Sequence, residues 1–154
     1  METKKELKDI RIKVFGTGWW LYMILMVIFL ILITKAGRAL PFERKRLFLL
    51  GLSILEFLVL RLYKLNLKDI RENYNYFNEL PCYLCNQSTI LCIIGAYTLN
   101  TAIMSHCVSV GTLGAMLALT MPDRHNRDLP LFSKQAFGFY GYHALLVVTC
   151  LSFY

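Results

Sequence analysis

Five long apolar blocks, separated by short polar or charged segments, constrain the fold of this 154-residue chain more than any other feature. Each block approaches or reaches the roughly 17–25 residues that an α-helix needs to cross a bilayer. A hydrophobic share of 56% and a mean hydropathy of +0.48 are high for a soluble domain. The chain is therefore predicted to be one all-α domain over residues 1–154, a polytopic transmembrane helix bundle of about five spans. The expected spans cover residues 19–34, 47–63, 80–99, 102–121 and 134–154.

The first apolar block raises the alternative of a cleaved signal peptide, because basic residues precede it and small residues follow it. The apolar run is long for a signal peptide, and Lys35 lies close to any cleavage site. We therefore expect residues 19–34 to remain as a helix of the bundle.

The net charge of +7 does not indicate nucleic acid as a partner, because the basic residues lie at the ends of apolar blocks. The N-terminal tail, the segment after the second block and the segment after the fourth block together carry 12 Lys and Arg. The opposite side of a five-span bundle would carry 5. By the positive-inside rule, the chain is predicted to be an integral protein of the plasma membrane with a cytoplasmic N-terminus.

Two residues with reactive side chains, Cys85 and His143, lie inside apolar blocks. Ionisable groups are costly in hydrocarbon, so they usually face the interior of a bundle or a wet cavity. At a helical rise of about 1.5 Å per residue, Cys85 lies about 9 Å, His143 about 14 Å and Glu56 roughly 8–12 Å from the same end of the bundle. A thiol beside an imidazole suggests a nucleophile with its base, and Glu56 is a candidate residue to orient His143.

Each of these residues also has a purely structural interpretation. A thiol packs as a small apolar group, and a buried imidazole can simply bond a backbone carbonyl or a hydroxyl. Glu56 can likewise be a hydrogen-bonded packing residue.

The third block carries a stripe of polar and thiol side chains on one helix face, formed by Cys82, Cys85, Thr89 and Cys92. Cys82 and Cys85 form a C-x-x-C at the start of a helix, which leaves a membrane thiol oxidoreductase as an alternative function. The odd count of five cysteines favours reduced thiols over a secreted disulfide framework. Their spacing to histidines matches no known metal-binding type, so we expect neither a metal nor a cofactor.

Four motifs between Leu80 and Leu146 carry a resemblance to a known family; they are Leu80–Asn86, Gly111–Ala115, Leu119–Asp123 and Phe139–His143. In order and spacing they resemble the YwaF-like family of polytopic membrane proteins, which includes an animal ether-phospholipid acyltransferase. The resemblance implies that Cys85 accepts an acyl group as a thioester and that His143 acts as general base and acid. The acyl chain would then pass to a lysophospholipid hydroxyl.

The expected function is therefore that of a membrane-embedded acyltransferase acting on phospholipid or lysophospholipid, with membrane lipids as its partners. The family implies further helices after Tyr154, so the resemblance also implies a C-terminally truncated member. This leaves open a non-enzymatic membrane subunit or scaffold within a homo- or hetero-oligomer. A helix face of small residues would serve such packing; it comprises Gly111, Gly114, Ala115 and Ala118.

Overall fold

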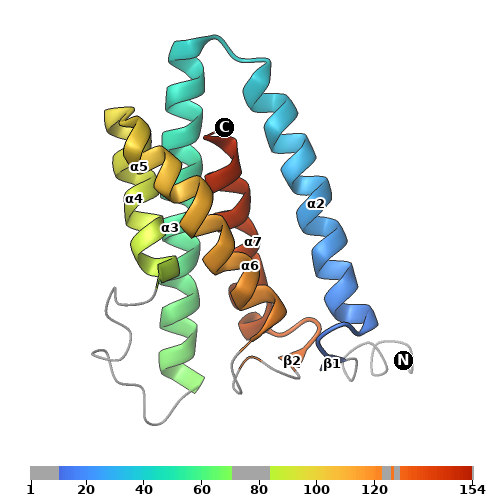
Figure 1. The fold of residues 1–154 in the computed structure, drawn as a ribbon. Helices are drawn as coiled ribbons and strands as arrows, with labels where there is room; N and C mark the ends of the chain where they lie inside the picture. The colour runs from blue at the N-terminus through green and yellow to red at the C-terminus, as the bar shows by residue number, and fades with distance from the viewer. Residues whose placement is uncertain (1–10, 71–83, 123–125, 127–128, 154) are drawn as a thin grey trace.

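The computed structural model describes residues 11–70, 84–122, 126 and 129–153. These residues are mostly helical, with two strands of two residues each, as Figure 1 shows. The elements in chain order are β1 (Arg11–Ile12), α2 (Thr17–Arg38), α3 (Phe42–Ile70), α4 (Leu84–Thr98), α5 (Thr101–His106), the π-helical turn η2 (Cys107–Gly111), α6 (Thr112–Thr120), β2 (Leu129–Pro130) and α7 (Lys134–Ser152).

The helical class predicted from the apolar blocks is confirmed for the described residues. α5, η2 and α6 follow one another without a break and form one rod in Figure 1, so each predicted block has one helical rod. The predicted bounds are too short for α3, which covers 29 residues where residues 47–63 were expected. The added turns contain Arg, Lys and Leu, which are good helix formers but lie outside an apolar window. The expected start of the third span at residue 80 lies outside the described residues.

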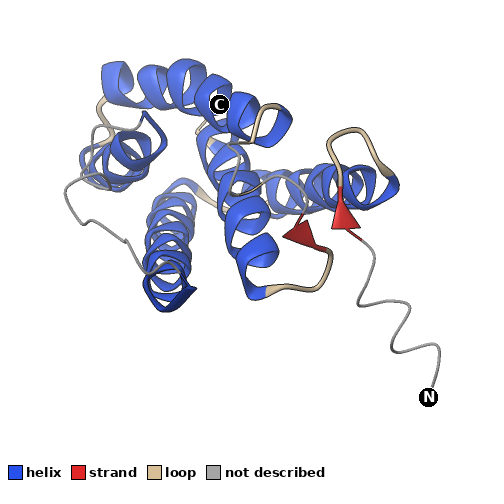
Figure 2. Cartoon of the chain, turned by 90° about the horizontal axis from the view of Figure 1, so that it is seen from below, coloured by secondary structure: helices blue, strands red, loops and turns tan. Residues whose placement is uncertain are grey.

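α7 lies in the middle of the bundle and packs against α2, α3, α4 and α6 (Figure 2). Its side chains are buried around most of its circumference, from Ala136 to Cys150. In a membrane bundle, polar side chains usually face the protein interior, and α7 is covered by protein around most of its circumference. This explains why α7 tolerates Gln135, Tyr142 and His143 within a bundle of this kind.

The outer face of α2 is strongly apolar and exposed. Its large apolar side chains from Trp20 to Leu32 are 40–58% exposed, which in water would form an unfavourable patch. In the part of the chain that the structure describes, two helices are long and apolar enough to cross a membrane: α2, with a mean hydropathy of 2.2, and the rod Thr101–Thr120, with 1.6. These surfaces suit contact with lipid.

The N-terminal half of α2 is firmly attached to the rest of the bundle. The indole Nε1 of Trp19 donates a hydrogen bond of 2.9 Å to the carbonyl of Leu119, and the hydroxyl of Tyr22 donates one of 2.8 Å to Leu131. The ring of Tyr22 also stacks on that of Tyr140, with centroids 5.0 Å apart. These contacts with α6 and α7 favour a retained helix over a cleaved signal peptide.

A short antiparallel ladder, which the sequence did not indicate, joins β1 to β2 at one end of the bundle. Arg11 pairs with Pro130 and Ile12 with Leu129, and Ile12 is fully buried. The ladder places the N-terminal strand and the connection between α6 and α7 at the same end. In a chain with five spans, these two basic segments would lie on the same side of the membrane.

The link between α4 and α5 is the tight connection that Asn100 and Thr101 predicted. The side chain of Asn100 caps α5 by accepting hydrogen bonds from the backbone N–H groups of Ala102 and Ile103. Leu99 adopts a left-handed conformation with φ of 55° and closes the end of α4 through its N–H to Gly95. The two helices therefore reverse direction within a few residues.

Candidate functional site

Cys85 lies in the first turn of α4 and carries a free, half-buried thiol. Its sulfur points toward α6, where a Cβ added to Gly114 would lie 3.8 Å from it. Because Gly114 has no side chain, the space next to the sulfur stays open on that side. The glycine that the sequence placed on a packing face thus borders the candidate nucleophile.

Two hydroxyl groups hold the backbone of Cys85 in place. Its carbonyl oxygen accepts hydrogen bonds of 3.0 Å from Thr89 on the same helix and of 3.0 Å from Tyr142 on α7. The hydroxyls of Thr89 and Tyr142 are themselves 2.9 Å apart. Tyr142 is therefore the link that fixes the start of α4 to the central helix.

His143 follows Tyr142 directly and is buried, with the rings of Phe139 and Tyr142 centred 4.6 and 4.7 Å from its imidazole. Its Nδ1 lies 2.8 Å from the carbonyl oxygen of Phe139. A carbonyl oxygen can only accept a hydrogen bond, so Nδ1 must carry the proton. In the neutral imidazole the lone pair is then on Nε2, which makes Nε2 the basic nitrogen.

Glu56 on α3 is completely buried and faces the hydroxyls of Thr89 and Thr149. Among the described residues, neither of its carboxyl oxygens makes a hydrogen bond of good geometry. The Nδ1 of His143, which a triad carboxylate would hold, is instead bonded to Phe139. The structure thus brings Glu56 next to Thr89, and its orienting effect on His143 stays a prediction.

Three further thiols form a buried cluster between α4, η2 and α7. The sulfurs of Cys92 and Cys150 are 3.6 Å apart, Cys107 lies next to Cys92, and all three residues are fully buried. In the described part of the chain, no group of three or more His, Cys, Asp or Glu is arranged to hold a metal ion. These thiols fit the structural interpretation, in which cysteine packs as a small apolar group.

The small residues of the η2–α6 face pack inside this bundle. A Cβ on Gly111 would lie 2.8 Å from the sulfur of Cys150 and 3.2 Å from the side chain of Ser88. Ala115 is also fully buried. This face therefore serves the close approach of α4 and α7 to η2 and α6.

We expect Gly111→Ala to destabilise the protein by about 1–3 kcal/mol, because the added methyl overpacks a closed contact. The measurement is the thermal unfolding midpoint of the purified protein in detergent. Gly51→Ala is the matched control, since a Cβ there meets nothing within 4 Å. Equal unfolding midpoints for the two variants would contradict the packing described.

The structure joins the carbonyl of Cys85 to Tyr142, the residue before His143. The pairing of the Cys85 thiol with the His143 imidazole stays a prediction, and two residues that contact Cys85 were missed from the sequence. Thr89 was noted only as part of a stripe, and Tyr142 was not singled out. The sequence signal that could have indicated Tyr142 is its position directly before His143 inside an apolar block. Cys82 lies outside the described residues.

The chain matches the model of a known family, and comparisons with curated proteins and with solved structures found no match. The model of the TMEM164 family matches residues 14–154, from the segment before α2 to the end of α7. The match thus includes every helix described above and both candidate residues, Cys85 and His143. It agrees with the expectation of a membrane protein and names no activity. The chain belongs to the TMEM164 family, a family of transmembrane proteins.

Proposed function

We propose that this protein is a membrane-embedded acyltransferase that transfers an acyl chain to a lysophospholipid through a thioester on Cys85. His143 is the general base and acid of the reaction. The observation that carries the proposal is the hydrogen bond of 2.8 Å between Nδ1 of His143 and the carbonyl of Phe139. It leaves the lone pair on Nε2, which is the form that a general base requires.

The first half of the reaction loads the enzyme. Nε2 of His143 takes the thiol proton of Cys85, and the thiolate attacks the carbonyl carbon of an acyl ester in the donor lipid. A carbon–sulfur bond forms, the ester carbon–oxygen bond breaks, and the leaving alkoxide takes the proton from the imidazolium. The products are the acyl-enzyme and a deacylated donor.

The second half returns the enzyme to its starting state. Nε2 takes the proton of the lysophospholipid hydroxyl, whose oxygen attacks the thioester carbonyl. The carbon–sulfur bond breaks, and the thiolate of Cys85 regains the proton. No oxidant, metal or cofactor enters this balance.

Tyr142 and Thr89 act as positioning residues in this scheme. They hold the carbonyl of Cys85 and so fix the first turn of α4, which carries the thiol. Glu56, buried beside Thr89, is the candidate to orient this hydroxyl pair and, through Tyr142, the neighbouring His143. Placement within about an ångström matters for covalent catalysis.

Removing the hydroxyl in Tyr142→Phe is expected to lower kcat about tenfold, because one hydrogen bond contributes roughly 0.5–1.5 kcal/mol. The KM for lysophospholipid should stay near its wild-type value, since Tyr142 acts on the thiol and not on the acceptor. Tyr97→Phe, on the exposed end of α4, is the control. A rise in KM with unchanged kcat would contradict the positioning role.

The proposed setting is a five-span protein of the plasma membrane with its N-terminus in the cytoplasm. The ladder between β1 and β2 supports this topology, because it joins two basic segments at one end of the bundle. Cys85 and His143 then act from the cytoplasmic half.

Tags at residue 3 and in the link between α2 and α3 should lie on opposite sides of the membrane. In intact cells, only the tag in the α2–α3 link should be accessible from outside.

The proposed function is tested with purified protein in vesicles. The donor is a phospholipid with an isotopically labelled acyl chain, and the acceptor is an unlabelled lysophospholipid. We expect labelled acceptor product that depends on the protein and that is lost in His143→Gln. Equal product formation by wild-type protein and His143→Gln would overturn the proposal, and so would the absence of product from wild-type protein.

A further inference from the structure

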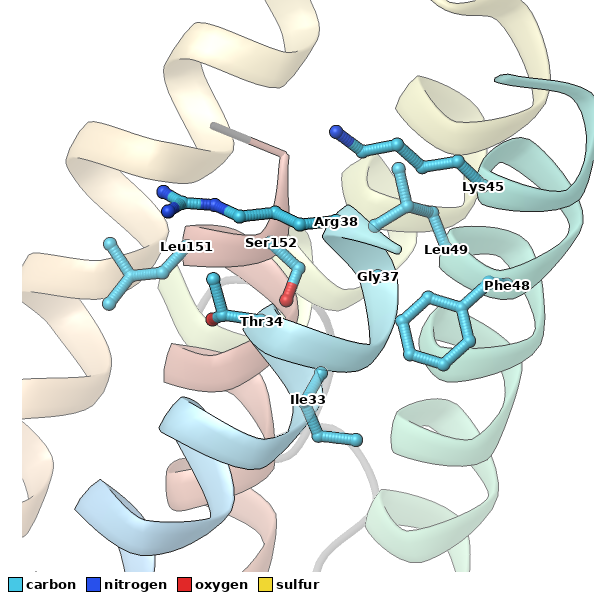
Figure 3. Close-up of a pocket in the computed structure, with 9 residues that line it drawn as sticks. All are labelled: Ile33, Thr34, Gly37, Arg38, Lys45, Phe48, Leu49, Leu151 and Ser152. Atoms are coloured by element: carbon cyan, nitrogen blue, oxygen red, sulfur yellow. The ribbon is translucent and has the colours of Figure 1, made fainter. Parts of the chain in front are cut away.

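A small pocket, drawn in Figure 3, lies at the end of the bundle opposite the β1–β2 ladder, as the positions of the α2–α3 turn and the ladder in Figure 1 show. It forms where the end of α2, the start of α3 and the end of α7 meet. The turn between Arg38 and Phe42 joins α2 to α3 above it, and α7 ends below this turn at Ser152. The enclosed cavity has a volume of about 50 Å³.

The lining of this pocket has two chemically distinct parts. Its walls are apolar and come from Ile33, Phe48, Leu49 and Leu151. Its rim carries the cationic side chains Arg38 and Lys45, both labelled in Figure 3. Thr34 and Ser152 also line the pocket, and the hydroxyl of Ser152 donates a hydrogen bond of 2.7 Å to the carbonyl of Val148.

The two cations are not engaged elsewhere in the described part of the chain. Neither Arg38 nor Lys45 has a hydrogen bond or ion pair from its side chain to another described residue, and no acidic residue lines the pocket. Arg46, by contrast, is occupied: its guanidinium donates a hydrogen bond of 2.7 Å to the carbonyl of Tyr97 and lies 5.7 Å from that ring. The rim therefore presents two positive charges and no balancing carboxylate.

We propose that this pocket binds the phosphate of an anionic phospholipid between Arg38 and Lys45. Arg38 is the last residue of a helix long and apolar enough to cross a membrane, which places the rim at the headgroup level. Clustered cations at this level attract anionic lipid headgroups. In the topology proposed above, the pocket faces the non-cytoplasmic leaflet, so the lipid would come from that leaflet. A phosphate accepts hydrogen bonds from guanidinium and ammonium groups, and Arg38 and Lys45 supply both.

The apolar walls favour a lipid over free inorganic phosphate. The enclosed volume of about 50 Å³ takes one small group and no complete lipid, so most of the ligand must lie outside it. Below the rim, α2 leans away from α3 (Figure 1), and its outer face is apolar and exposed. The acyl chains would run along this surface, with their first carbons against Phe48 and Ile33.

The test measures lipid binding to the purified full chain by native mass spectrometry. Phosphatidylglycerol is the anionic probe and phosphatidylcholine the zwitterionic one. Arg38→Gln/Lys45→Gln should weaken phosphatidylglycerol binding by roughly 10- to 30-fold, because each cation at the surface contributes about fivefold. The control is Lys35→Gln/Arg44→Gln, which removes two exposed cations at the same end of the bundle, outside the pocket.

The proposal would be overturned by equal affinity in the pocket variant and wild type, by an equal loss in the control variant, or by equal binding of both lipids. Displacement of phosphatidylglycerol by excess inorganic phosphate alone would instead indicate a free-phosphate site and would also overturn it. An unchanged unfolding midpoint shows that the pocket variant is folded. The proposal does not rest on acyl transfer, and the pocket variant should retain that activity.

Discussion

Replacing Cys85 with alanine is expected to lower acyl transfer by about 10³-fold or more, because removal of the nucleophile from a covalent mechanism costs on the order of 10³–10⁶. The fold should persist, since the thiol is half-buried and lies in a space left open by Gly114. The measurement is the initial rate of labelled product formation in vesicles. The unfolding midpoint of the variant, compared with wild type, separates loss of chemistry from loss of fold.

Cys82→Ala is the matched control for this experiment, because it removes a thiol from the same segment of the sequence. An acyltransferase that uses Cys85 should keep a rate close to wild type in this variant. A thiol oxidoreductase would need both cysteines of the C-x-x-C. Equal losses in Cys82→Ala and Cys85→Ala would therefore contradict the assignment of the nucleophile and favour redox chemistry.

Replacing His143 with glutamine is expected to lower the rate by about 10²–10⁴-fold, the usual contribution of a general base. Glutamine can still donate a hydrogen bond to the carbonyl of Phe139, so the packing around α7 should be largely kept. It cannot accept a proton at the position of Nε2. The rate of thioester formation, followed in single-turnover experiments, should therefore fall together with the overall rate.

His106→Gln is the control for the histidine variant. His106 is exposed on α5, so its loss should leave the rate unchanged. If His143→Gln kept its activity while its unfolding midpoint fell, the histidine would be a structural residue bonded to a backbone carbonyl. This outcome would match the structural interpretation, in which a buried imidazole bonds a backbone carbonyl.

The helical segments could be predicted from the sequence because an apolar segment long enough to cross a bilayer satisfies its backbone hydrogen bonds by forming a helix. The central place of α7 was not predicted, because hydropathy measures the composition of a segment and not what covers it. α7 contains Tyr142 and His143 and is tolerated in the bundle because protein surrounds it. The β1–β2 ladder, of two residues per strand, is too short to leave a periodic pattern.

At the candidate site, the helical rise alone predicts similar depths for Cys85 and His143. The link through Tyr142 could not be predicted, because it depends on the rotation of α7 relative to α4. The same limit applies to Glu56. The helical rise predicted its depth in the bundle but not its neighbours, which are Thr89 and Thr149 in the structure.

The alternative function of a non-enzymatic scaffold was based on the small residues of the fourth block, which could form a packing surface for a partner protein. In the structure, Gly111 packs against Cys150 and Ser88, and Gly114 lies beside Leu84 and Cys85. These residues are used within the chain, so they give no reason to expect a partner on this face. Membrane lipids remain the proposed partners.

Mass spectrometry of the peptide that contains Cys85 tests the central claim most directly. The protein is incubated with the labelled donor lipid in the absence of acceptor, and the thiol-bound acyl group is then sought. We predict an acyl thioester on Cys85 that hydroxylamine removes and that disappears when lysophospholipid is added. Acyl transfer with an unmodified Cys85, or a thioester on another cysteine that turns over at the same rate, would contradict the account.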